Sequence, residues 1–84
     1  MNTGKTTIKI KDVPFLVWAI YDHPKDHPNH FVVRCQTIIA GATFFGSPRL
    51  YSSLEMARKF GVPPGMTRVS RADEDDPVIV ETWI

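Results

Sequence analysis

The chain has 84 residues, of which 43% are hydrophobic and 11% aromatic, and its ten Lys and Arg residues nearly balance nine Asp and Glu residues. A chain this short can close one core but not two, so we expect a single domain over residues 1–84. The composition excludes a disordered chain, and the net charge of +1 gives no electrostatic indication of a nucleic-acid or anionic-membrane partner.

Cysteine content and the length of apolar runs predict the cellular compartment of the protein. Cys35 is the single cysteine, which rules out an intramolecular disulfide and favours a reducing compartment. The longest apolar run, 13–21, contains Pro14 and is much shorter than the ~20 residues of a membrane span. The N-terminal residues lack an apolar segment of the secretory type. We therefore expect a cytoplasmic protein that does not enter a membrane.

Two strands are expected near the start of the chain. Residues 6–11 alternate polar and apolar side chains, with Ile8 and Ile10 on one face, which is typical of a half-buried strand. Residues 15–21 are apolar on both faces, which places this strand in the centre of a sheet, with a helix over one side.

A turn-rich loop and further strands follow. Residues 22–30 are rich in Asp, Asn and Pro, which favour turns through their backbone geometry. Residues 31–39 form a further strand, and we expect them to pair antiparallel with residues 15–21 around this loop. A short strand is expected over 43–45, after a glycine-containing turn.

One helix is expected between Ser52 and Gly61. Ser52 and Glu55 have the spacing of a capping box, which predicts Ser52 as the N-cap. Gly61 has the position of a glycine that ends a helix, and Arg58 and Lys59 lie in the last turn, where cations suit the helix dipole. The side chains expected to form the buried stripe are Leu54 and Ala57, with either Arg58 or, at looser spacing, Phe60.

The C-terminal residues complete the predicted fold. Residues 66–71 are an extended segment, residues 72–76 an acidic loop and residues 77–84 a last strand. Because the strands mostly precede the single helix, the order β-β-β-(β)-α-β predicts an α+β fold. We expect a mostly antiparallel sheet of three to five strands with one helix packed on one face.

The sequence lacks the residue patterns of the common enzyme classes. It contains neither a paired-carboxylate nor a serine-nucleophile signature, and Cys35 on a strand is typical of a small core residue. We therefore expect a protein that is not an enzyme and that has no cofactor.

The loop over 22–30 contains histidines that are candidate metal ligands. Imidazole and carboxylate groups together suit zinc and similar ions. The spacing matches no closed zinc site, and two of the histidines precede proline, which favours extended backbone. A metal-binding protein that uses His23, His27 and His30 is therefore the alternative function, which a zinc titration would test.

The apolar surplus of the strands gives the leading functional hypothesis. One short helix cannot cover both faces of a sheet whose central and last strands are apolar on both sides, so we expect exposed aromatic surface. Trp, Tyr and Arg contribute most to binding at such surfaces. We expect a small accessory module, of the size of bacterial or phage accessory and inhibitor proteins, that binds another protein or a second copy of itself through a sheet face or an edge strand. The expected anchors are Trp18, Tyr21, Phe44, Phe45 and Trp83, with Arg34 and Arg49 as the polar rim.

A nucleic-acid-binding module is the second alternative. Lys5, Lys9, Lys11 and Arg34 would line strand faces beside Tyr21, where they would contact phosphates and stack bases. The balanced charge argues against this alternative, and the sequence contains none of the common RNA-binding signatures. Salt-dependent binding of DNA or RNA would test it.

Overall fold

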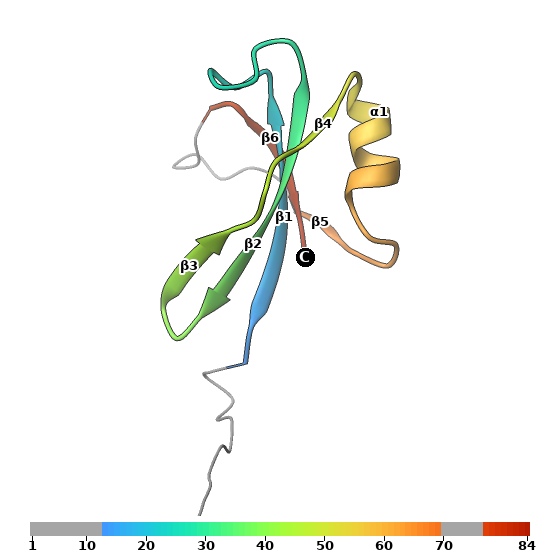
Figure 1. Ribbon diagram of the computed structural model, residues 1–84. Helices are drawn as coiled ribbons and strands as arrows, with labels where there is room; N and C mark the ends of the chain where they lie inside the picture. The colour runs from blue at the N-terminus through green and yellow to red at the C-terminus, as the bar shows by residue number, and fades with distance from the viewer. Residues whose placement is uncertain (1–12, 70–76) are drawn as a thin grey trace, which may run out of the picture.

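The computed structural model describes residues 13–69 and 77–84. Their elements are β1 (Phe15–Asp22), β2 (Phe31–Ile39), β3 (Ala42–Phe45), β4 (Arg49–Tyr51), α1 (Leu54–Met56), its continuation η2 (Ala57–Gly61), β5 (Arg68–Val69) and β6 (Ile79–Trp83). The predicted α+β class is confirmed, although the described residues form six strands instead of three to five (Figure 1). The strand expected over 6–11 and the acidic loop expected over 72–76 lie outside the described residues.

The strand order of the sheet is β3-β2-β1-β6-β5, and β4 also pairs with β2. Every pairing is antiparallel, and β1 lies in the centre, with Trp18 opposite both Cys35 of β2 and Trp83 of β6. This confirms the prediction of a central strand, apolar on both faces, that pairs antiparallel with the next strand. The sequence pattern did not predict β4, a strand of three residues that pairs with the beginning of β2.

β2 and β3 form a hairpin that extends past the helix (Figure 1). Ile39 lies opposite Ala42, so the turn consists of Ala40 and Gly41 alone, with φ angles of 49° and 83°. Two successive positive φ angles are typical of the type I′ turn, whose twist matches that of the flanking strands. Ala40 is therefore strained, whereas Gly41 adopts this backbone readily.

A bulge separates β3 from β4. Phe45 lies opposite Gln36 and Arg49 lies opposite Val33, so four steps from Phe45 to Arg49 match three steps along β2. The extra residue lies within 46–48, and it changes the alternation of the side chains. Phe45 and Arg49, which would share a face in a regular strand, therefore face opposite sides of the sheet.

The helix begins one residue later than predicted. Ser53, not Ser52, is the N-cap: its backbone is extended, and its hydroxyl accepts a hydrogen bond from the Met56 amide at 3.1 Å. Tyr51 is still paired with Phe31 in the sheet, so the chain leaves the strand through both serines before it turns. No helix within the described ranges is long and apolar enough to cross a membrane.

The second half of the helix, η2, has a π-helical turn, which changes the side chain that faces the sheet. Ala57 and Gly61 are buried, whereas Phe60 is 60% exposed, so the alternative in which Phe60 completes the buried stripe is wrong. A Cβ atom at Gly61 would lie 2.6 Å from Cγ2 of Val33, so a glycine allows the helix to approach β2 this closely.

The core lies between the helix and one side of the sheet. We call this side, which carries Trp18, Ile20 and Val33, the helix face, and the side that carries Tyr21 and Val32 the open face. The buried core residues are Ile20, Val33, Ala57 and Val62. The helix is short, and it covers only the part of the sheet away from the β2–β3 hairpin (Figure 1).

Candidate binding site on the open face

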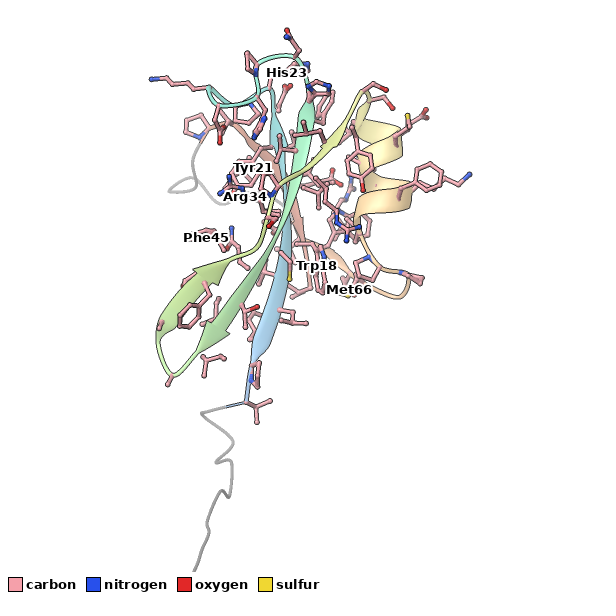
Figure 2. All side chains as sticks on the ribbon, viewed as in Figure 1. Trp18, Tyr21, His23, Arg34, Phe45 and Met66 are labelled. Atoms are coloured by element: carbon pink, nitrogen blue, oxygen red, sulfur yellow. The ribbon has the colours of Figure 1, made fainter. Side chains whose placement is uncertain are left out.

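The predicted anchor residues divide between the two faces. Tyr21, Arg34 and Phe45 point to the open face, whereas Trp18 points to the helix face (Figure 2). Trp18 and Trp83 are partly buried against the core. The structure therefore does not gather the predicted set into one surface.

Phe44 and Arg49 belong to the helix face. Phe44 lies opposite Thr37 in the hairpin, beyond the helix, and is 58% exposed. Arg49 lies opposite Val33 and is also exposed. Neither residue contacts the three predicted residues of the open face through an ion pair or hydrogen bond among the described residues.

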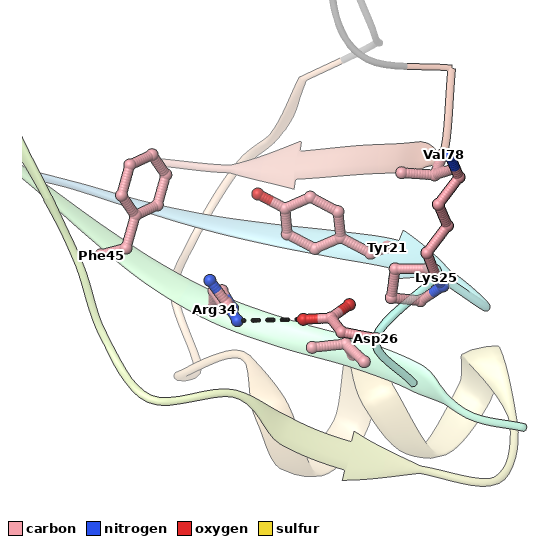
Figure 3. A pocket seen from close by; sticks show the side chains of 8 residues that line it. Tyr21, Lys25, Asp26, Arg34, Phe45 and Val78 are labelled. Carbon is pink, nitrogen blue, oxygen red and sulfur yellow. Dashed lines mark hydrogen bonds and ion pairs between the residues drawn. The ribbon is translucent and has the colours of Figure 1, made fainter. Parts of the chain in front are cut away.

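A cavity of about 540 Å³ lies on the open face and brings three predicted residues together. Figure 3 shows Tyr21 of β1, Arg34 of β2 and Phe45 of β3 around it. The lining residues are Tyr21, Pro24, Lys25, Asp26, Val32, Arg34, Phe45 and Val78. Their mixture of aromatic, aliphatic and charged side chains resembles the centre and rim of a protein interface.

The loop between β1 and β2 forms one wall of this cavity. Asp22 donates its backbone N–H to the carbonyl of Val78 at 2.7 Å, and His23 donates to the carbonyl of His30 at 3.1 Å. These bonds hold the ends of the loop beside the sheet. The loop thereby lies next to Val32, which is only 1% exposed, although it faces away from the helix.

The polar rim of the cavity is weakly paired. Nη2 of Arg34 donates to Oδ2 of Asp26 at 3.5 Å, and the side chains of Arg34 and Asp26 are 30% and 61% exposed. Nε2 of Gln36 donates to the hydroxyl of Tyr21 at 3.2 Å. An exposed ion pair of this length contributes little to stability, so Arg34 can exchange Asp26 for a partner's carboxylate at small cost.

The three histidines of the predicted metal site do not converge. His23 contacts Asp22 and lies edge-on to Phe31, with ring centroids 4.8 Å apart, whereas His27 lies 3.9 Å from Asp26. Within the part of the chain that the structure describes, no group of three or more His, Cys, Asp or Glu side chains is arranged to hold a metal ion. The metal-binding alternative stays a prediction.

A buried ion-pair network on the helix face was not predicted. Glu81 lies opposite Ile20 and is 4% exposed. It accepts hydrogen bonds from Arg58 at 2.7 and 2.9 Å and from the indole of Trp83 at 2.8 Å, and Arg68 lies 3.8 Å away. This network attaches the helix to β6, because Arg58 lies on η2.

Burial and hydrogen bonding shift the pKa of Glu81 in opposite directions. Burial is the strongest single influence and raises its pKa, but hydrogen bonds from Arg58 and Trp83 and the charges of Arg58 and Arg68 together lower the pKa of Glu81 below its ordinary value. The hydrogen bond to Glu81 in turn raises the pKa of Arg58. Both groups are therefore ionised at neutral pH, and their role is structural.

Sequence reasoning missed most of the cavity wall. Lys25, Asp26 and Val78 line the cavity because a loop and a strand end fold beside the sheet, and alternation along single strands carries no signal for this. Comparison of the chain with protein-family models, with curated proteins and with solved structures finds no match. The functional proposal therefore depends on the geometry and chemistry of this site.

Proposed function

We propose that the protein is a small non-enzymatic accessory module that binds another protein, or a second copy of itself, through its open face. One observation carries the proposal: an aromatic and aliphatic cavity with an Arg34–Asp26 rim lies on the face opposite the helix. Buried aromatic anchors inside a polar rim are the arrangement that concentrates binding free energy in protein interfaces.

The exposure of Phe45 supports this proposal. Phe45 is 60% exposed at the edge of the cavity, and Leu50 on the same face is 43% exposed. Burying the remaining surface of one such aromatic ring is worth on the order of 2 kcal/mol. A partner that covers the cavity would gain this free energy from the burial of Phe45 alone.

A strand edge offers a second component of the same surface. Among the strands of residues 13–69 and 77–84, β3 pairs on one side alone, with β2, and it bears Phe44 and Phe45 at its end. An extended partner segment could add to such an edge through backbone hydrogen bonds and place side chains beside the cavity. The expectations of a cytoplasmic location and of a bacterial or phage origin belong to this proposal.

A matched pair of substitutions tests the proposal. Phe45 and Phe60 are both 60% exposed, but they lie on opposite sides of the molecule. Sedimentation equilibrium over a wide concentration range would measure the mass of the wild-type, Phe45→Ser and Phe60→Ser proteins. If the partner is a second copy, mass rises towards a dimer in the wild type and Phe60→Ser and stays monomeric in Phe45→Ser.

A different partner predicts a monomer at every concentration. Affinity capture from a lysate of the native host should then retain at least one protein that is common to the wild type and Phe60→Ser and is lost with Phe45→Ser. The proposal would be contradicted if no captured protein were lost with Phe45→Ser, or if a monomeric protein captured nothing.

A further inference from the structure

A second cavity lies on the helix face, on the other side of the sheet from the first. It encloses about 630 Å³ between the loop that follows the helix and the bulge between β3 and β4. Trp18, Val33 and Cys35 lie on its sheet side, residues 61–64 form one wall, and residues 46–47 form the other. We call this cavity the helix-face groove.

The charge of the helix-face groove is of one sign. Arg49 and Lys59 line it, both are exposed, and no carboxylate of the described residues lines it. Within residues 13–69 and 77–84, neither cation has an ion-pair partner, and Nζ of Lys59 lies 5.5 Å from the ring centroid of Phe60. Within the described part of the chain, therefore, no carboxylate neutralises these two positive charges.

The buried carboxylate of the same face does not offset this charge. Glu81 is held by Arg58 at 2.7 Å and lies 3.8 Å from Arg68, so its charge is already matched by two guanidinium groups. The bulge also contributes, because the extra residue within 46–48 is what turns Arg49 to this face.

Apolar surface accompanies the two cations. Trp18 is partly buried on the sheet side of the groove, Phe60 is exposed at its rim, and Pro63 and Pro64 are exposed on one wall. Aromatic rings and prolines are rigid, so they lose little conformational entropy when a ligand covers them.

We propose that the helix-face groove binds a short acidic segment of a partner protein. Its carboxylates pair with Arg49 and Lys59, and one of its apolar side chains packs against Trp18. A groove of this volume accommodates a few side chains, as small-ligand sites do, and not a folded domain. This site is separate from the open face, so either proposal can fail alone.

The chemistry favours an acidic peptide over a nucleic acid. A single strand of nucleic acid needs a continuous row of cations that follows its phosphates, and the groove offers two cations between glycine and proline walls. The net charge of +1 gives no long-range attraction for a polyanion.

Fluorescence anisotropy would test the proposal with three labelled probes. The first is a peptide in which Glu alternates with Leu, the second has Gln in place of each Glu, and the third is a single-stranded oligouridylate. We expect the full chain to bind the Glu peptide, in a salt-dependent manner, and to bind the Gln peptide at least about tenfold more weakly.

Charge reversal locates the binding site. Lys59→Glu and Arg49→Glu should each weaken binding of the Glu peptide several-fold, and the double variant by about tenfold or more, because attraction becomes repulsion. The matched control is Lys25→Glu, which makes the same charge change on the open face and should leave the affinity within about twofold. If a reversal unfolds the protein by circular dichroism, Lys59→Gln and Arg49→Gln replace it.

The remaining results would overturn the inference. They are failure to bind the Glu peptide, equal affinity for the Gln peptide, preference for the oligouridylate, and equal weakening by Lys25→Glu and Lys59→Glu. A loss of peptide binding on Phe45→Ser would also assign the site to the open face instead.

Discussion

The helix face and the open face are built from alternate residues of the same strands, but different elements cover them. On the helix face, Ile20 and Val33 are almost fully buried beneath the helix. On the open face, Ala19 and Val32 are as fully buried, with the loop between β1 and β2 beside Val32, whereas Phe45 of the hairpin is 60% exposed. The comparison indicates that both faces contribute to the buried core, and that the cavity beside the exposed Phe45 is the part of the open face suited to binding.

The two arginine–carboxylate pairs show the same difference. Arg58 makes two hydrogen bonds, at 2.7 and 2.9 Å, to the buried carboxylate of Glu81. Arg34 makes one long contact, at 3.5 Å, to the exposed carboxylate of Asp26. A buried pair is costly to break, whereas an exposed pair is nearly neutral, so the first is suited to holding the fold and the second to exchange.

The largest expected effect comes from the buried aliphatic residues. Ile20→Ala should lower the free energy of unfolding by about 3 kcal/mol, because it leaves a cavity beneath the helix. Leu50→Ala, on the open face and 43% exposed, should cost less than about 1 kcal/mol. Urea denaturation would measure both, and equal losses would contradict the placement of Ile20 in the core and of Leu50 at the surface of the open face.

The arginine pairs provide the next comparison. Arg58→Ala should destabilise the protein by about 2 kcal/mol, below the usual cost of breaking a buried pair, since Arg58 is 38% exposed and Arg68 remains near Glu81. Arg34→Ala should cost less than about 0.5 kcal/mol. Thermal unfolding monitored by circular dichroism distinguishes the two, and a larger loss for Arg34→Ala would contradict the assignment of roles.

The loss of stability at acid pH should come in part from Glu81 on the helix face. The folded protein lowers the pKa of Glu81, so this carboxylate stabilises the fold at pH values above its ordinary pKa in the unfolded chain. That stabilisation is lost as the pH falls through its lower pKa in the folded protein. Unfolding measured between about pH 6 and pH 2 should show a steeper acid loss for the wild type than for Glu81→Gln. Parallel curves would show that Glu81 is not linked to folding.

The smallest expected effect on stability is that of Phe45→Ser. The residue is 60% exposed, so the free energy of unfolding should change by less than about 0.5 kcal/mol. The same substitution should abolish binding through the open face. Chemical denaturation beside the sedimentation experiment would check this, and a large loss of stability would place Phe45 in the core instead.

Much of the fold could be predicted, because alternation of side chains along a strand is a local property. The central position of β1 and its antiparallel pairing with β2 followed from apolar residues on both faces and from the turn-forming loop between them. The N-cap could not be fixed, because the pairing of Tyr51 with Phe31 decides where the chain leaves the sheet. The exposure of Phe60 depends on the π-helical turn and on the close approach of Gly61, which are tertiary effects.

The candidate site could be predicted in residue type but not in arrangement. The sequence pointed to aromatic anchors with an arginine rim, and the open-face cavity contains Tyr21, Phe45 and Arg34. Alternation along β1 already puts Trp18 and Tyr21, three residues apart, on opposite faces. The side of Arg49 could not be predicted, because the bulge changes the alternation between β3 and β4. The predicted binding roles of all these residues stay predictions until the variants are measured.

The bulge between β3 and β4 also fixes which side chains of β4 reach the core. With one residue fewer within 46–48, Arg49 and Tyr51 would turn to the open face, and Leu50 would take the place of Tyr51 on the side of the helix. Because Tyr51 packs against the core cluster, a single deletion there would remove a core contact although it only shortens a connection at the surface.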